Sequence, residues 1–377
     1  MIGRRNVLLG KVAKAVSVRA STDCTDPVYS VTKHAGMVPS SEYFKKQVFS
    51  RDIEGYKVVR RGQFAYATIH LDEGSIGLLD TVDRAVVSPM YTVFETDSAQ
   101  VYGPYLLRLL KSERALSRYQ TMGNGSVHRR RAIPFETLEK LEIALPDVEE
   151  QKRIAAILDK ADSLRRKRRQ AIRLADDFLR AVFLDMFGDP LTNPKGWPVS
   201  ELKALGQVST GRTPPGDKPG MFGGETPFVT PGDLESEAPA KRSLTEAGVA
   251  EVNTVRSGAA LVCCIGATIG KMGKATKRSA FNQQINAVEW NGLIDDDYGL
   301  AALRFFKAEI ARQGASTTLP ILKKSSFEKL RITVPPIKLQ QAFTAQVATA
   351  ERLRSSSNRS LAEIESLQAA LQNESFA

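Results

Sequence analysis

The feature that most constrains this chain is an internal repeat. The segment LEKLEIALP at 138–146 returns as FEKLRITVP at 327–335, displaced by 189 residues in a chain of 377. Five positions are identical in the two copies, and Gln151 matches Gln340 in the same register. A duplication of this size predicts two similarly built halves and a pseudo-twofold molecule.

The sequence alternates between two textures, which divide it into four segments. Residues 1–147 and 191–336 contain short β-prone runs broken by glycine and charge, and these predict mixed, strand-rich domains. Residues 148–190 and 337–377 predict two long helices, because glycine and proline are missing from 148–187 and from 337–377. Gly188 and Pro190 would end the first helix. We therefore expect an α+β fold in which two pseudo-repeated domains are separated by two long helices.

A heptad pattern connects the two predicted helices. Steps of three and four residues from Ile154 reach Ile157, Ala161, Leu164, Arg168, Ala171, Ala175, Phe178 and Val182, which are apolar near both ends. The same steps, displaced by 189, reach Phe343, Gln346, Ala350, Leu353, Ser357, Ser360, Ile364, Leu367 and Leu371. The simplest arrangement is an intramolecular antiparallel coiled coil, and a dimer that uses the same stripes is the alternative.

Composition favours a polyanionic partner and a reducing compartment. The formal net charge is +11, which is typical of nucleic-acid-binding proteins but does not prove that function. The three cysteines, Cys24, Cys263 and Cys264, lack the spacing of a zinc site or a disulfide framework. No run of about 18 apolar residues occurs, so we expect no membrane association and a cytoplasmic location.

The sequence lacks the motifs of common catalytic sites. GATIGKMGK at 266–274 resembles a phosphate loop, but only three residues separate Gly266 from Gly270, and Met272 replaces the required Ser or Thr. The three histidines are scattered, and the Asn/Asp-Pro-Pro-aromatic motif of adenine methyltransferases is missing. We therefore expect no catalytic, cofactor-binding or metal-ligating residues in this chain.

Basic and amide side chains gather in irregular segments of both domains, where they could approach a DNA groove. Arg and Lys suit guanine, whereas Asn and Gln suit adenine. The candidates in the first domain are Lys33, His34, Ser40, Ser41, Tyr43, Lys45, Asn124, Ser126, His128, Arg129 and Arg130, and those in the second are Arg212, Thr213, Lys218, Thr230, Asp233, Ser316, Thr317 and Lys323. Asn282, Gln283 and Gln284 could read bases or serve the fold. The basic run at 165–169 could contact phosphates or form a solvated helix surface.

The segment LEKLEIALPDVEEQKRIAAILDKADSL at 138–164 resembles the central conserved region of the DNA specificity subunit of type I restriction-modification systems. In that family a strand ends in proline, and a Glu-Gln-x-Arg-Ile motif opens a long spacer helix. The matching residues are Pro146, Glu150, Gln151, Arg153 and Ile154. SVTKHAGMVPSSEYF in the first half, and WPVSELKALGQVSTGRTP and TPFVTPGDL in the second, also resemble the family. The second helix departs from the motif, since Leu339 and Ala342 replace Glu150 and Arg153.

The resemblance implies a non-catalytic subunit that binds double-stranded DNA through two target recognition domains, each reading one half of a bipartite site. Helices spanning about 30 residues, roughly 45 Å, would set a spacing of about 13 base pairs. Partners would be two methyltransferase subunits, which bring S-adenosylmethionine, and two motor-nuclease subunits, which bring ATP and Mg²⁺.

The resemblance also implies an interface role for residues on the two helices, either with partner subunits or between the helices. These residues are Gln151, Arg153, Ile154, Ile157, Leu164, Phe178, Gln340, Phe343, Leu353, Ile364 and Leu367. Two other functions stay open from the residues alone. One is a self-sufficient DNA methyltransferase or nuclease with degenerate motifs, and the other is a basic coiled-coil protein that binds nucleic acid without specificity.

Overall fold

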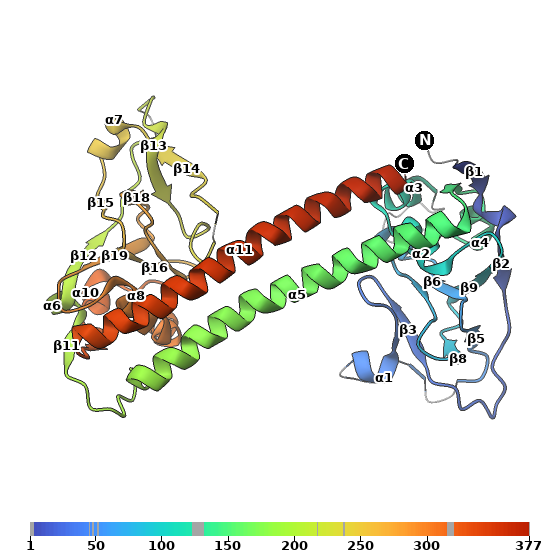
Figure 1. Cartoon of the computed structure of the whole chain (residues 1–377), viewed down its shortest axis with the longest axis horizontal. Helices are drawn as coiled ribbons and strands as arrows, with labels where there is room; N and C mark the ends of the chain where they lie inside the picture. Colours follow the sequence, from blue (N-terminus) through green and yellow to red (C-terminus); the bar gives the residue numbers. More distant parts are fainter. Residues whose placement is uncertain are drawn as a thin grey trace. The chain divides into compact units, whose positions relative to one another are not determined.

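The computed structural model describes residues 4–44, 46, 49–50, 53–122, 132–216, 218–236, 238–314 and 320–376. The chain forms two compact units, the first comprising Met1–Arg168 and Arg359–Ala377, and the second comprising Arg169–Asn358 (Figure 1). Each unit holds one globular domain and about half of each long helix, α5 (Val148–Phe187) and α11 (Ile337–Phe376). Both long helices are confirmed, whereas the predicted domain boundaries stay a prediction.

The first domain is built on a four-stranded antiparallel sheet of order β2-β9-β6-β7, with the pairs β1–β10, β3–β4 and β5–β8 around it. Its strands are β1 (Arg5–Leu8), β2 (Ala13–Val16), β3 (Tyr29–Thr32), β4 (Gly36–Pro39), β5 (Lys57–Arg60), β6 (Phe64–Ala67), β7 (Ile76–Leu78), β8 (Arg84–Val87), β9 (Tyr91–Thr96) and β10 (Glu142–Leu145). Its helices are η1 (Leu9–Lys11), α1 (Ser40–Tyr43), η2 (Leu71–Glu73), α2 (Gly103–Leu110), α3 (Glu113–Met122) and α4 (Phe135–Leu138).

The second domain repeats this scaffold with the sheet β12-β19-β16-β17 and the pair β11–β20, and it has a further sheet of order β14-β13-β18-β15. Its strands are β11 (Val199–Glu201), β12 (Gly206–Thr210), β13 (Phe222–Val229), β14 (Arg242–Leu244), β15 (Thr254–Val255), β16 (Ala260–Cys263), β17 (Met272–Lys274), β18 (Ser279–Phe281), β19 (Ile285–Trp290) and β20 (Arg331–Thr333). Its helices are α6 (Leu202–Leu205), α7 (Glu246–Ala250), α8 (Asp296–Phe305), α9 (Lys307–Gly314) and α10 (Lys324–Phe327). The predicted fold class, two repeated α+β domains with two long helices, is confirmed.

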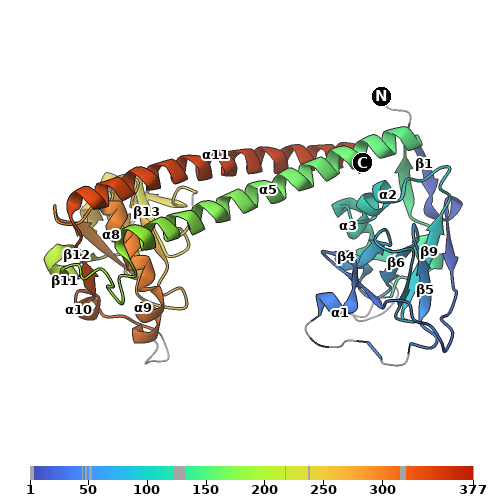
Figure 2. The same cartoon turned by 60° about the horizontal axis from the view of Figure 1, so that its bottom comes forward.

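The end of a long helix completes the core of each domain. In the first unit the end of α11 lies beside α2 (Figure 2). Phe376, the last residue of α11, packs there against Tyr105 with ring centroids 5.6 Å apart. In the second unit Phe187, at the end of α5, packs against Tyr298 at 4.8 Å. All four rings are buried. Because Phe187 and Phe376 are themselves 189 residues apart, the repeat includes the packing at both helix ends.

A buried glutamine joins each domain to the helix that follows it. The side-chain oxygen of Gln151 accepts a hydrogen bond from the backbone N–H of Tyr102 at 2.8 Å. Its amide nitrogen donates to the carbonyl oxygens of Gln100 at 2.8 Å and Pro146 at 2.9 Å. One side chain in the first turn of α5 thus satisfies three backbone groups of the domain and its last strand.

Gln340 makes the same three contacts in the second unit. Its oxygen accepts from the backbone N–H of Asp295 at 2.8 Å, and its nitrogen donates to the carbonyls of Leu293 at 3.0 Å and Pro335 at 2.7 Å. Both glutamines are fully buried. We call this arrangement the glutamine junction.

The two long helices pair antiparallel within each unit. In the first unit Gln368 of α11 donates to the carboxylate of Asp162 of α5 at 3.0 Å. In the second unit Arg354 of α11 lies 3.3 Å from Asp176 of α5. The start of α5 therefore meets the end of α11 in one unit, and the reverse holds in the other, as the antiparallel prediction requires.

The predicted interface residues on these helices fall into a buried and an exposed set, and their interface role stays a prediction. Ile154 and Phe343 are buried, and Ile364 is partly buried. Counted from Ile154 and from Phe343, the less exposed positions recur after four residues and then after three. They include Leu158, Arg165, Leu179, Val347, Arg354 and Gln368. The residues predicted at the intervening positions are instead exposed: Ile157 by 40%, Leu164 by 38%, Phe178 by 49%, Leu353 by 63% and Leu367 by 71%.

The difference between the two sets has a physical cause. The heptad pattern follows the largest apolar side chains, whereas several inward positions carry polar or charged groups that bond across the helix pair. Asp162, on the inward face, accepts from Gln368 and also binds Arg108 of α2 at 2.8 Å. These hydrogen bonds satisfy groups that hydrophobicity alone would place outside.

Replacing Gln340 by alanine should lower the free energy of unfolding of the second unit by about 3 kcal/mol or more, because three backbone groups lose their partner. Trp197 and Trp290, the two tryptophans of the chain, both lie in that unit, so tryptophan fluorescence during urea unfolding follows it. Gln346→Ala, at an exposed position of the same helix, is the control. A loss under about 1 kcal/mol for Gln340→Ala would contradict a stabilising role for the junction.

Candidate nucleic-acid interface

The two domains share a backbone hydrogen bond at one end of the central sheet. This end lies where β6 finishes in the first domain and where β16 finishes in the second. In the first domain the backbone N–H of Ile133 donates to the carbonyl of Thr68 at 2.9 Å, just after β6. In the second, Leu322 donates to Cys264 at 2.8 Å, just after β16. We call this region of each domain the loop end, defined by residues 68–70, 88–91 and 133 in the first domain and by 264–266, 282–285 and 321–322 in the second.

A cavity of about 240 Å³ opens at the loop end of the first domain. Its walls are mainly aromatic and aliphatic, with hydroxyl groups and one imidazole among them; they comprise Val28, Tyr29, Ser30, Phe49, Tyr56, Ala67, Thr68, Ile69, His70, Ser88, Met90 and Tyr91. Aromatic and aliphatic walls with a few polar groups suit a planar ligand such as a nucleobase.

A positive charge lies beside this cavity. The ammonium of Lys57 donates to the carbonyl of Tyr91 at 2.6 Å. Burial lowers the pKa of Lys57, and the nearby positive charge of Arg19 lowers it further. Positive groups beside a base-sized cavity match the phosphates that flank any base in DNA.

The predicted contact residues of the first domain occupy two places. Lys33 and His34 are exposed at the tip of the β3–β4 hairpin, where Lys111 donates to the carbonyl of Lys33 at 2.8 Å. Ser41 and Tyr43 are exposed on α1. Ser40 is buried and bonds to the hydroxyl of Ser30 at 2.7 Å, so it supports the fold. The candidates outside the described residues are Lys45, Asn124, Ser126, His128, Arg129 and Arg130.

In the second domain, Arg212 and Thr213 are exposed beside the loop end. The backbone N–H of Arg212 donates to Phe281 at 3.0 Å, and the hydroxyl of Thr213 donates to the side-chain oxygen of Gln283 at 2.6 Å. Lys323 is exposed at the start of α10. Ser316 and Thr317 lie outside the described residues.

The other candidates of the second domain are occupied by partners from the same chain. The hydroxyl and backbone N–H of Thr230 donate to Asp233 at 2.7 and 2.8 Å. Burial raises the pKa of that carboxyl, but these hydrogen bonds outweigh it, so the net pKa is lowered. Thr230 and Asp233 therefore form a local turn. Lys218 is also paired within the chain, since its ammonium lies 2.8 Å from the carboxylate of Glu251.

Sequence reasoning missed the cavity and left Gln283 undecided. Met90 and the tyrosines of the cavity are apolar or aromatic, so a search for basic and amide residues passes over them. A comparison of the strands that follow would have aligned Ser88–Tyr91 with Asn282–Ile285. The difference between their central residues, Pro-Met and Gln-Gln, was the available signal.

At the helix starts, Arg153 bonds to Glu150 of its own helix at 2.6 and 2.7 Å. This bond from Arg153 lowers the pKa of Glu150. Both residues belong to the first two turns of α5. The corresponding positions of α11 carry Leu339 and Ala342, which cannot form an ion pair. Arg153 is therefore available at the surface, whereas Gln151 and Gln340 are committed to the glutamine junctions.

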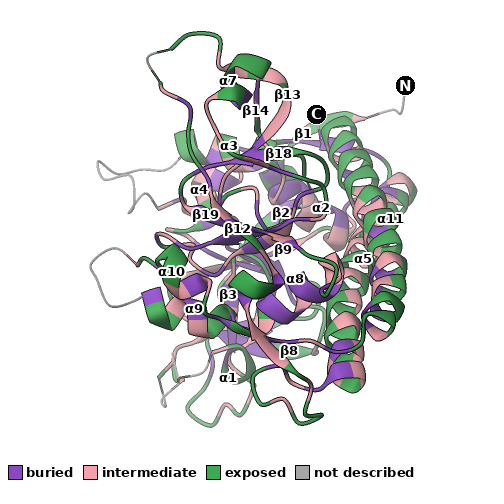
Figure 3. Ribbon diagram, turned by 90° about the vertical axis from the view of Figure 1, so that its left-hand side faces the viewer, coloured by how far each residue is buried: buried purple, intermediate pink, exposed green. Residues whose placement is uncertain are grey.

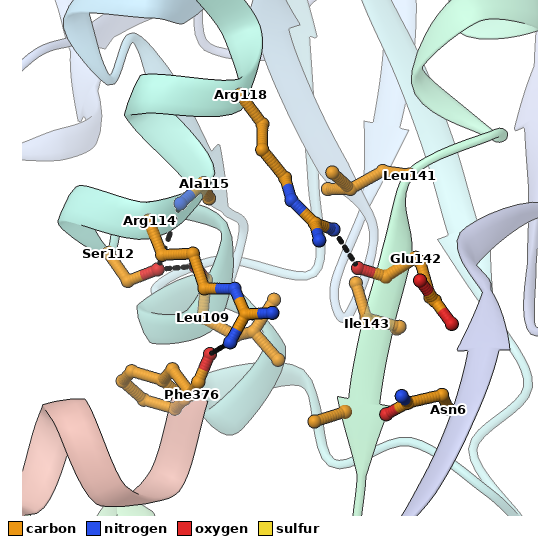
Figure 4. A pocket seen from close by; sticks show the side chains of 11 residues that line it. Asn6, Leu109, Ser112, Arg114, Ala115, Arg118, Leu141, Glu142, Ile143 and Phe376 are labelled. Atoms are coloured by element: carbon orange, nitrogen blue, oxygen red, sulfur yellow. Dashed lines mark hydrogen bonds between the residues drawn. The ribbon is translucent and has the colours of Figure 1, made fainter.

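A notch of about 30 Å³ lies where the end of α11 meets the first domain. Arg118 donates to the carbonyl of Glu142 at 2.8 Å, and Arg114 donates to that of Phe376 at 3.5 Å (Figure 4). Both arginines thus bind backbone carbonyls that belong to the fold. The notch is too small for a nucleotide, and we assign it to the anchoring of α11.

Within the described ranges, no group of three or more His, Cys, Asp or Glu side chains has the arrangement of a metal site. The described helices also include none with the length and apolar character that crossing a bilayer requires.

A scaffold that is built twice, with a long helix after each copy and different loops on each, defines a class of bipartite recognition proteins rather than a class of enzymes with one central active site. The model of the type I restriction modification DNA specificity domain matches residues 68–174 and 194–366. The chain therefore belongs to the family of type I restriction-modification DNA specificity subunits.

Two relatives agree with this assignment. The type I restriction enzyme HindI specificity subunit of Haemophilus influenzae is 21% identical over 95% of this chain and 96% of its own. The type I restriction enzyme MjaIX specificity subunit of Methanocaldococcus jannaschii is 24% identical over 66% of this chain and 62% of its own.

Solved structures support the fold. The S subunit of a type I restriction-modification system from M. genitalium superposes with a TM-score of 0.65 at 13% identity, covering 100% of this chain and 96% of that one. A chain from a structural study of type I R-M complex assembly gives 0.57 at 19% identity, covering 99% and 97%. Family membership makes this chain a DNA-recognition subunit of a restriction-modification system, and not its catalytic subunit.

Arg212→Ala should weaken binding to cognate and random duplexes by similar factors, because an exposed arginine at the loop end contributes mainly a phosphate contact. The slope of log affinity against log salt concentration should fall by about 0.9. Fluorescence anisotropy at several salt concentrations measures both quantities. Lys329→Ala, at an exposed position of the same domain beside β20, is the control. An unchanged salt slope would exclude a phosphate contact by Arg212.

Proposed function

We propose that this chain directs a type I restriction-modification complex to a bipartite and asymmetric DNA site, with each loop end reading one half-site. The observation that carries this proposal is the repetition of one scaffold with different residues at its loop ends. The junctions and the central sheets repeat, while the loops beside them carry unlike side chains. A symmetric frame with unlike reading surfaces suits two unequal half-sites.

The proposal also assigns a role to the two long helices. Each is 40 residues long, and each begins at a glutamine junction in one unit and ends in the core of the other domain. We propose that the length of these helices sets the spacing between the half-sites. A helix rises about 1.5 Å per residue and DNA about 3.4 Å per base pair, so the helix length corresponds to a number of base pairs along the duplex.

The exposed apolar residues of the helices support two equivalent docking sites for methyltransferase subunits. Ile157, Leu164 and Phe178 repeat at multiples of seven on α5, so they share one face. In α11, Leu353 and Leu367 lie 189 residues after Leu164 and Phe178, so they hold the corresponding positions of the repeat. Figure 3 shows the outer surfaces of both helices as largely exposed. We call these five residues the outer stripe, and its repetition favours two bound methyltransferase subunits.

The remaining partners and cofactors follow from this proposal. Two motor-nuclease subunits would complete the complex, and S-adenosylmethionine, ATP and Mg²⁺ would enter with the partners rather than with this chain. A target in cellular or incoming DNA implies action in the cytoplasm.

Co-expression of this chain with its methyltransferase subunit should produce adenine methylation at one bipartite motif, since recognition and chemistry reside on different chains. Methylome sequencing of the host measures the motif directly. The controls are hosts that express the methyltransferase subunit alone and hosts that express this chain alone. Methylation at the same motif by the methyltransferase subunit alone would refute the proposed role.

The outer stripe predicts a change in subunit stoichiometry. Phe178→Glu combined with Leu353→Glu places two charges on apolar positions of the second unit and should reduce the bound methyltransferase subunits from two to one. Native mass spectrometry of the purified complex counts them. Arg173→Glu with Ser355→Glu adds two glutamates elsewhere on the exposed surfaces of the same helices and serves as the control. Two retained subunits in the stripe variant would exclude this docking surface.

A further inference from the structure

One turn has the same backbone hydrogen bond in both domains but presents different side chains. Tyr91 donates its backbone N–H to the carbonyl of Ser88 at 3.0 Å, and Ile285 donates to Asn282 at 3.1 Å. In each case the turn leads into the central strand, β9 or β19, which pairs on both sides in the sheet. Two residues lie between these hydrogen-bonded ends in each domain. Pro89 and Met90 are both exposed, whereas in the second domain Gln283 is exposed and Gln284 is half-buried. Gln283 and Met90 therefore occupy neighbouring, not identical, positions of the corresponding turns.

The turn of the second domain is held by two of its three amides. The side chain of Asn282 donates to that of Gln284 at 3.1 Å, and Gln284 donates to the carbonyl of Ile265 at 3.3 Å. Asn282 is only 9% exposed and Gln284 is half-buried, so both serve the fold. Gln283, between them, is exposed.

A second residue fixes the direction of the Gln283 amide. The hydroxyl of Thr213 donates to the Gln283 side-chain oxygen at 2.6 Å. An amide oxygen has two lone pairs, so one stays available, together with both N–H donors of the side chain. In the described part of the chain, no acceptor is hydrogen-bonded to those donors. The side-chain amide of Gln283 is thus held in one orientation while some of its hydrogen-bonding groups stay available. This is what a residue that recognises another molecule requires.

The corresponding turn of the first domain presents an apolar side chain. Met90 is 71% exposed and lies at the cavity bounded by Tyr56 and Tyr91. The hydroxyl of Ser88 accepts from the backbone N–H of Met90 at 3.4 Å, and Pro89 fixes the backbone before it. The fold gives this methionine little burial, so its position has no evident structural benefit.

We propose that this turn is a specificity determinant in both domains, with Gln283 reading an adenine in one half-site and Met90 contacting a thymine methyl group in the other. The inference rests on the proposed DNA-reading function and assigns it to particular residues. Glutamine can donate to N7 and accept from the N6 amino group of adenine in the major groove. An apolar side chain instead favours the methyl group that distinguishes thymine.

The contact at Gln283 uses the atoms that Thr213 leaves available. One N–H of Gln283 donates to adenine N7, and the second lone pair of its oxygen accepts from adenine N6–H. Thr213 is a positioning residue, because it contacts the glutamine and not the base. The adenine in question is one that is read, distinct from the adenine that receives the methyl group.

Methylome sequencing of hosts that co-express each variant with the methyltransferase subunit tests the assignment. Gln283→Ala should relax one A·T position in a single half-site, with a loss of discrimination of about 5-fold to 100-fold there. Met90→Ala should relax one position in the other half-site by a smaller factor. Gln207→Ala, exposed on β12 opposite Glu289 at the far end of β19, should leave the motif unchanged.

Two further variants separate base reading from a structural effect. Gln283→Glu removes the donors and should shift the preference at that position toward cytosine, whose N4 amino group donates to a carboxylate. Thr213→Val should weaken discrimination at the same position without changing the preferred base. A structural role for either residue would lower Tm or total methylation without moving the preference at one position.

The outcomes distinguish this inference from the function on which it rests. If the unmodified chain directs no bipartite motif, the proposed function fails. If the unmodified chain directs such a motif but Gln283→Ala and Gln283→Glu both retain it at every position, the assignment of the turn is overturned and the proposed function stands. A change that spreads over both half-sites also overturns the assignment.

Discussion

The glutamine junction is the contact on which the rest of this structure depends. Three hydrogen bonds from one buried side chain connect the first turn of a long helix to the last strand before it and to the segment that enters α2 or α8. A buried amide left without these partners would carry a large desolvation cost, so the helix has few alternative directions. The direction of each helix relative to its own domain is thereby determined within the first two turns.

This constraint explains why the repeat is strongest around the EKLxIxxP segment and the glutamine that follows it. Proline ends the strand because it offers no backbone N–H, yet its carbonyl stays available to the glutamine. The pattern therefore encodes a junction rather than a single element. Elsewhere the two halves share fewer identities, because an apolar core accepts many residues of similar volume.

The same distinction separates what could be predicted from what could not. The helix bounds, the repeated α+β scaffold and the position of the junction follow from glycine, proline and apolar periodicity. The inward positions of the helices are not all those of the heptad pattern, because Asp162 and Gln368 lie between the helices and satisfy each other. A pattern of hydrophobicity contains no record of which polar groups will find a partner across a helix pair.

Loop chemistry was the least predictable part, for a related reason. Composition alone treats Ser40, Ser41 and Thr230 alike, yet Ser40 is buried against Ser30, Ser41 is exposed, and Thr230 is bonded to Asp233. Only the three-dimensional partners show which polar groups are already used. In a protein that reads another molecule, the informative side chains are those that the fold orients but does not satisfy. Gln283 and Met90 have this property at neighbouring positions of corresponding turns in the two domains, so unlike recognition can arise on a repeated scaffold without disturbing the junctions that hold it.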